Sequence, residues 1–77
     1  MLKIKYYRVV IEEQCITDVN HIKVIKRTEK SFFSEKKAWE MMLNADSNPM
    51  HIDYKSENKD DVLAISKQVI EDTITLF

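Results

Sequence analysis

The first third of the chain, residues 2–30, most constrains the fold, because it predicts a long β-hairpin. Residues 2–11 are dense in β-branched and aromatic side chains, which favour strands. Leu2, Ile4 and Tyr6 alternate with lysines, the period of two expected of a strand with one buried face. The chain has no glycine, so Asn20 is the expected left-handed turn residue, with residues 12–14 as an alternative turn.

The alternation blurs at residues 7–11, which allows two interpretations. Either both faces of the strand are covered there, or a bulge near Tyr6 and Tyr7 shifts the phase. The bulge would point one set of side chains inward: Leu2, Ile4, Tyr6, Val9 and Ile11. It would point another set outward: Lys3, Lys5, Arg8, Val10 and Glu12. On the return strand, Ile22 and Val24 would point one way, and the other set comprises Lys23, Ile25 and Arg27.

A helix is predicted after the hairpin. Ser34 is a suitable N-cap, and the helix should run to about residues 44–46. It should end before Pro49, because the residue before a proline is disfavoured in helical conformation. Its apolar side chains recur at helical spacing and comprise Ala38, Met41, Met42 and Ala45.

The last third predicts a strand and a second helix. In residues 50–56, apolar Met50, Ile52 and Tyr54 alternate with polar side chains. Asn58 is the expected cap of a C-terminal helix, whose stripe would comprise Val62, Ile65, Val69, Thr73 and Leu76. The element order predicts a single α+β domain over residues 1–77, a ββαβα two-layer sandwich. Its three-stranded sheet would have order 2-1-3, with two helices on one face.

Chain size and composition bound the class of protein. A chain of 77 residues buries only roughly 60% of its unfolded surface, so a further stabilising device is expected. A single cysteine permits no intrachain disulfide, and no Cys/His cluster could hold zinc. A second chain is the remaining device, which predicts a homodimer. Scarce cysteine predicts a cytoplasmic location, and no apolar run reaches the roughly 20 residues of a membrane helix.

The charge is unevenly distributed along the chain. Residues 1–37 carry nine Lys/Arg against five Asp/Glu, whereas residues 38–77 carry three against eight. This split predicts a basic hairpin and an acidic second half. The candidate basic interaction face comprises Lys3, Lys5, Arg8, Lys23 and Arg27.

No catalytic signature is present in the sequence. His21 and His51 are far apart in the chain, and no short ligand spacing relates them to other metal-binding side chains. Cys15 has no glycine-rich turn to form an oxyanion site, and a phosphate-binding loop also requires glycine. The sequence therefore predicts no enzymatic activity, no metal and no cofactor, and Cys15 is expected to be a small buried or half-buried thiol.

The leading functional prediction is a small non-catalytic protein-interaction module. Its candidate apolar interface comprises Val10, Ile25, Phe32 and Trp39. The alternative for Trp39 is core packing under the sheet. The Lys- and Ile-rich composition is typical of an AT-rich bacterium or its mobile elements, which favours an accessory or inhibitory protein that binds a partner protein. An edge strand, either the return strand of the hairpin or the third strand, could also pair with that partner. The alternative is a nucleic-acid-binding protein that uses the basic hairpin face.

Overall fold

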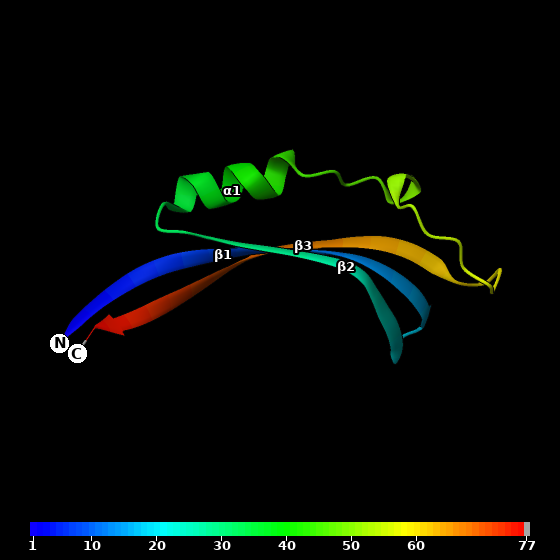
Figure 1. Ribbon diagram of the computed structural model, residues 1–77, viewed down its shortest axis with the longest axis horizontal. Coiled ribbons are helices and arrows are strands. Elements are labelled where there is room, and N and C mark those ends of the chain that lie inside the picture. The colour runs from blue at the N-terminus through cyan, green and yellow to red at the C-terminus, as the bar shows by residue number, and fades with distance from the viewer. Residues whose placement is uncertain (77) are drawn as a thin grey trace.

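A three-stranded antiparallel sheet with one helix across one face forms the protein (Figure 1). The computed structural model describes residues 1–76. Its elements are β1 (Leu2–Asp18), β2 (His21–Phe32), α1 (Glu35–Asn44), the 3-10 helix η1 (Pro49–His51) and β3 (Val62–Leu76). The strand order is β2-β1-β3, so the predicted sheet order is confirmed, although its third strand is a different segment. The strands arch, α1 lies over the convex side, and the concave side carries no covering element among residues 1–76 (Figure 1).

The N-terminal hairpin is confirmed. The chain reverses at Val19 and Asn20, where the Asn20 N–H donates to Asp18 Oδ1 at 2.8 Å. The Nδ1 atom of His21 lies 2.8 Å from the other oxygen of the same carboxylate. The alternative turn at residues 12–14 is wrong, because these residues lie inside β1.

The predicted bulge near Tyr6 and Tyr7 is wrong. β1 pairs with β3 without interruption from Leu2 to Ile16. The register shifts lie in the pairing with β2, between Glu13 and Gln14 and between Ile16 and Asp18. Strict alternation therefore places Val9 on the face toward α1 and Val10 on the opposite face. Both are buried, at 0% and 2% exposure, and burial on both faces explains the blurred sequence pattern.

The predicted first helix is confirmed as α1. Ser34 is its N-cap, and the Ser34 hydroxyl accepts from the Lys37 N–H at 3.3 Å. Ala38 is fully buried, and the other residues of the predicted stripe are half-buried: Met41, Met42 and Ala45. The helix ends before Pro49, which starts η1 instead.

The predicted C-terminal helix and third strand are both wrong. Residues 62–76 form β3, and residues 50–56 form the end of η1 and an irregular segment. The molecule therefore has one helix on the sheet instead of two. Seven of the 15 residues of β3 are Val, Ile or Thr, whose branched side chains favour strands over helices. The apolar residues of this segment are spaced so that they suit either a helix or a strand. The segment forms a strand because it pairs with β1 along its whole length.

Candidate interaction surface

The two faces of the sheet differ in what covers them. We call the convex side the helix face, which carries Val9, Ile11 and Cys15 of β1 beneath α1 and residues 45–61. The concave side, the open face, carries the even-numbered residues of β1 and their cross-strand neighbours. The open face is the side of the sheet that no other element of residues 1–76 covers (Figure 1).

Ion pairs occupy the middle of the open face. Arg8 Nη1 lies 2.9 Å from Glu29 Oε1, and Arg27 lies 3.3 Å from both Glu29 and Glu12. Arg8 Nη2 also lies 3.8 Å from Asp72 Oδ2. Hydrogen bonding from Arg8, and then from Arg27, lowers the pKa of Glu29. We call these five residues the central ion network.

The central ion network accounts for the burial of Val10. The cross-strand neighbours of Val10 are Glu29 and Gln68, and Arg8 and Glu12 flank it on the same strand face. Ion pairing holds these long side chains across the face, and charged side chains held in this way cover neighbouring apolar surface with their aliphatic stems. The middle of the open face is therefore polar at its surface, and the apolar surface lies at its two ends.

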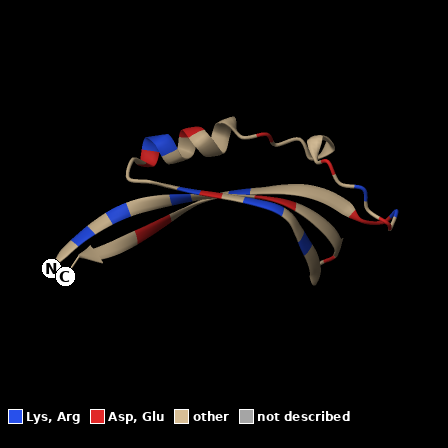
Figure 2. Cartoon of the chain, in the orientation of Figure 1, with Lys and Arg blue, Asp and Glu red and all other residues tan. Residues whose placement is uncertain are grey.

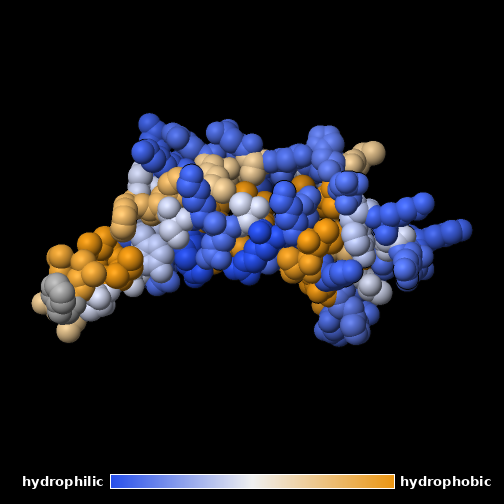
Figure 3. Space-filling view, in the orientation of Figure 1, coloured by the Kyte–Doolittle hydropathy of each residue, from blue (hydrophilic) through white to orange (hydrophobic). Residues whose placement is uncertain are grey.

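The first apolar end lies where the two termini meet. Leu2 pairs with Leu76 and Ile4 with Ile74, and we call these four residues the terminal cluster. Leu2 is 57% exposed, and hydrophobic atoms gather at this end of the molecule (Figure 3). Beside the cluster is a hollow of about 230 Å³ lined by Tyr6, Ser31, Phe32, Phe33 and Ile74. The Tyr6 hydroxyl donates to Asp72 Oδ2 at 3.2 Å, and burial together with this carboxylate raises the pKa of Tyr6.

The second apolar end lies beside the β1–β2 turn. Ile16 pairs with Ile22 and with Val62, and Val24 lies next to them on the open face. We call these four residues the hairpin cluster. β1 is paired on both sides here, with β2 and with β3. The cluster therefore exposes apolar side chains, but β1 has no free backbone edge beside it.

The five residues of the predicted basic face are not brought together on one face. Arg8 and Arg27 lie on the open face within the central ion network. Lys3 and Lys5 lie on the helix-face side at the terminal end, where Lys5 Nζ is 3.2 Å from Glu71 Oε1 and its pKa is raised by that contact. Lys23 is at the other end of the sheet, 3.3 Å from the Tyr54 hydroxyl. Figure 2 shows blue bands on the terminal half of β1, red on the neighbouring stretch of β3, and blue and red mixed near the middle of the sheet.

The predicted apolar interface is also dispersed. Val10 is buried beneath the central ion network, and Ile25 is half-buried at the β2 irregularity. Phe32 ends β2 and lines the terminal hollow, whereas Trp39 is 44% exposed on α1. Sequence reasoning missed Ile74 and Leu76 as members of the exposed terminal cluster, because it assigned them to a helix. The alternation of Leu2 and Ile4 was the available signal, but it was interpreted as core packing.

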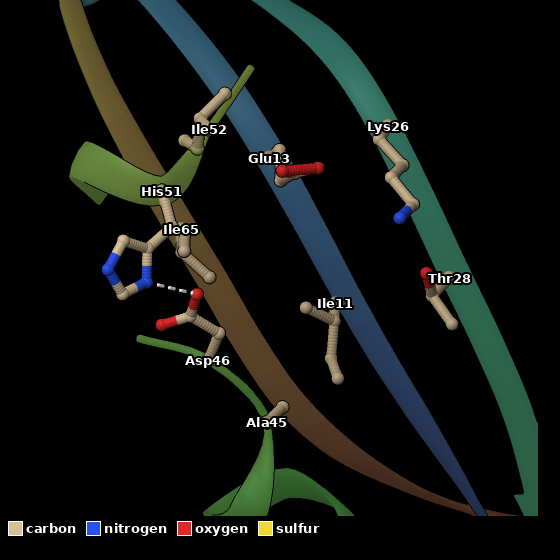
Figure 4. A pocket seen from close by; sticks show the side chains of 9 residues that line it. All are labelled: Ile11, Glu13, Lys26, Thr28, Ala45, Asp46, His51, Ile52 and Ile65. Carbon is tan, nitrogen blue, oxygen red and sulfur yellow. Dashed lines mark hydrogen bonds and ion pairs between the residues drawn. The ribbon is translucent and has the colours of Figure 1, made fainter. Parts of the chain in front are cut away.

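A second cavity lies on the helix face, between the sheet and residues 45–52 (Figure 4). Its lining residues are Ile11, Glu13, Lys26, Thr28, Ala45, Asp46, His51, Ile52 and Ile65. His51 Nδ1 lies 2.6 Å from Asp46 Oδ2, and both side chains are exposed. The Asn48 N–H, and then His51, lower the pKa of Asp46. These contacts join the two ends of the turn that follows α1. The role of Asp46 and His51 is therefore to stabilise this turn.

A cluster around Cys15 fastens residues 52–61 to the sheet. The buried Cys15 Sγ donates to Asp61 Oδ2 at 3.6 Å and lies 3.9 Å from Ser56 Oγ, and the Ser56 hydroxyl also donates to Asp61. The hydroxyl of Ser56, with smaller contributions from Thr17 and Cys15, lowers the pKa of Asp61. A carboxylate with a lowered pKa is a weak base and does not activate a thiol. The prediction of a small buried thiol is confirmed.

The described residues form neither a metal site nor a membrane-spanning helix. Among residues 1–76, no group of three or more His, Cys, Asp or Glu side chains is placed to hold a metal ion. No helix in this part of the chain is long and apolar enough to cross a membrane. No known family model, curated protein or solved structure matches this chain. Its function must therefore be inferred from its own surfaces.

Proposed function

We propose that this chain is a small non-catalytic module that binds a partner protein through the terminal end of its open face. The observation that carries the proposal is the terminal cluster, where apolar side chains from both ends of the chain are exposed beside an apolar hollow. Contiguous exposed apolar surface of this kind is uncommon on small proteins unless another molecule covers it. Accessory and inhibitory proteins act in this way, by occupying a partner's surface.

The chemistry around the terminal cluster supports a protein as the partner. An apolar centre with a charged rim is the usual composition of a protein interface. On the open face the charge beside the cluster is Asp72, with Arg8 Nη2 3.8 Å away, whereas Lys3, Lys5 and Glu71 lie on the other face of the same strands. Charges at a rim orient a partner and raise its association rate more than they raise affinity.

The nucleic-acid alternative would use a different basic surface from the predicted one. Lys23, Lys26 and Lys30 lie along the helix face of β2, and among residues 1–76 none of them forms an ion pair. Cations without ion-pair partners on one strand face are available to contact phosphates. Arg8 and Arg27, by contrast, are already neutralised by carboxylates. The alternative therefore predicts binding that depends on Lys26 and Lys30.

The deciding experiment is a pull-down from native extract with the tagged protein, with and without nuclease. Replacing Leu2 and Ile74 together by Asp should abolish capture of an identified partner protein, because charge would be placed in the apolar interface. The matched control replaces Ile22 and Val62 by Asp in the hairpin cluster and should retain the partner. A partner retained by the terminal variant would contradict the proposal. Nucleic acid lost from a Lys26→Glu/Lys30→Glu variant would support the alternative.

A further inference from the structure

β1 is a central strand along most of its length but becomes an edge strand at its N-terminal end. β2 ends at Phe32, which pairs with Tyr7, whereas β1 continues to Leu2. Residues 2–6 therefore pair on one side only, with residues 72–76 of β3. After Phe32 the chain leaves the sheet through Phe33 and enters α1 (Figure 1). We call the β2 side of residues 2–6 the unpaired edge.

The unpaired edge presents backbone hydrogen-bonding groups in line with β2. In an antiparallel sheet, successive residues direct their N–H and C=O groups to opposite sides of the strand. Alternate residues of the five thus face a track that no strand occupies among residues 1–76. Such groups form a template on which another extended chain can add.

We infer that the unpaired edge binds an extended segment of the partner protein as an added strand, with acidic and apolar residues in alternation. The inference rests on the proposed function and specifies its mode of binding. The added strand would continue the line of β2 beyond Phe32 and complete a third strand at the terminal end of the sheet.

The required alternation follows from the side chains of β1. Lys3 and Lys5 point to the helix-face side, whereas Leu2, Ile4 and Tyr6 point to the open face. Residues of an added strand that lie opposite the lysines share their face. A carboxylate opposite Lys3 meets a cation that forms no ion pair among residues 1–76, whereas a carboxylate opposite Lys5 would share that lysine with Glu71. Residues opposite Leu2, Ile4 and Tyr6 extend the terminal cluster and should be apolar.

The apolar hollow supplies an anchor at the start of the track. Its lining joins Phe32 and Phe33, where β2 ends, to Tyr6 and Ile74 on the open face. An apolar side chain of the added strand that enters it would bury the exposed ring of Phe33. Aromatic and aliphatic anchors seated in such hollows commonly dominate the affinity of protein interfaces.

Like charges oppose the addition of a second copy in the register that is centred on the middle of the unpaired edge. Antiparallel self-pairing centred on Ile4 would place Lys3 of each copy opposite Lys5 of the other. Like charges directly opposite each other destabilise a strand pair. An acidic segment of a different protein removes this repulsion and replaces it with attraction.

The test uses synthetic peptides as probes of the intact protein. A peptide of alternating glutamate and valine should bind, as measured by fluorescence anisotropy, and its affinity should fall by about tenfold in a Lys3→Glu/Lys5→Glu variant, because two attractions become repulsions. A peptide of alternating lysine and valine should show the opposite preference. The matched control, Lys26→Glu/Lys30→Glu, changes net charge equally and should bind as the parent protein does. Equal binding by both variants would overturn the inference.

Amide hydrogen exchange locates the added strand. The glutamate–valine peptide should slow exchange within residues 2–6 and leave the outer edges of β2 and β3 unchanged. Slowing along either outer edge instead would overturn the inference. Binding of an identified partner could depend on Leu2 and Ile74 and yet be unchanged by charge reversal at Lys3 and Lys5. That result would overturn the inference of an added acidic strand and leave the proposed function standing. Loss of dependence on Leu2 and Ile74 would contradict the proposed function itself.

Discussion

The two ends of the sheet both expose apolar side chains, but they differ in their backbone. At the hairpin end, Ile16 is paired on both sides, with Ile22 and with Val62. At the terminal end, Leu2 is paired on one side only. Exposed side chains alone offer a nonspecific apolar contact, whereas exposed side chains with unpaired backbone groups also specify the direction and register of a partner.

The segments that connect the strands reinforce this difference. Residues 52–61 lie over the helix face toward the hairpin end, and Ser56 and Asp61 fasten them to Cys15. At the terminal end, the connection from β2 turns directly into α1 and leaves residues 2–6 of β1 uncovered along one edge. Residues at the hairpin end are therefore expected to contribute more to the free energy of unfolding. Residues at the terminal end are expected to contribute more to partner binding.

The largest expected effect is the loss of stability on replacing Ile52 by Ala. Ile52 is buried against the helix face, and removing such a side chain leaves a cavity that costs about 2–4 kcal/mol in the free energy of unfolding. The control is Leu2→Ala in the terminal cluster, where an exposed position should cost no more than about 0.5 kcal/mol. Urea unfolding of both variants measures the difference. Equal losses would show that the terminal cluster is part of the core.

A smaller effect is expected for self-association at the unpaired edge. Lys5→Glu places a carboxylate opposite Lys3 of a second copy, so the repulsion that opposes antiparallel self-pairing becomes attraction. In sedimentation experiments at the same protein concentration, the variant should show a larger dimer fraction than the parent protein. Lys5→Gln removes repulsion without adding attraction and should dimerise more weakly. A Lys5→Glu variant that shows no added self-association would argue that this edge cannot accept a strand.

The homodimer expected from the small size of the chain stays a prediction. A dimer formed through any other surface would make the thermal midpoint rise with protein concentration in the parent protein as well. A midpoint that is constant over a hundredfold range would remove that expectation. Comparison with Lys5→Glu separates the unpaired edge from other surfaces.

Local signals in the sequence were sufficient for the first half of the fold. Ser34 caps the start of α1 through its own hydroxyl, and Pro49 begins η1 soon after α1 ends. Residues close in the sequence therefore determine both boundaries. The β1–β2 hairpin is likewise a local contact between adjacent segments. The fate of residues 62–76 is not local, because their spacing suits a helix or a strand. Pairing of Leu76 with Leu2, at opposite ends of the chain, decides between them.

The candidate site could be predicted only in part for the same reason. Lys3 and Lys5 were named from their alternation with Leu2 and Ile4, but Ile74 could join them only once β3 was a strand. The unpaired edge depends on the difference in length between β1 and β2. That difference arises because the chain leaves the sheet after Phe32 to begin α1, and no sequence pattern marks which strand it leaves uncovered.

The smallest expected effect is a difference in acid sensitivity between the two ends. The pKa of Asp61 is lowered mainly by the Ser56 hydroxyl, from an ordinary value of 3.8. In the unfolded chain this carboxylate is protonated near that pH, whereas in the folded protein it is protonated only at a lower pH. The stabilisation is therefore present above about pH 4 and is lost as pH falls through the lowered pKa.

Ser56→Ala should flatten the fall in unfolding free energy as the pH is lowered from about 5 toward 3, as measured by urea unfolding at a series of pH values. At the terminal end, the pKa of Asp72 is lowered mainly by the Thr73 N–H and only secondarily by Tyr6. Tyr6→Phe leaves that main donor in place, so it should flatten the profile less than Ser56→Ala does. An equal or larger change in Tyr6→Phe would contradict the assignment of the stronger side-chain fastening to the hairpin end.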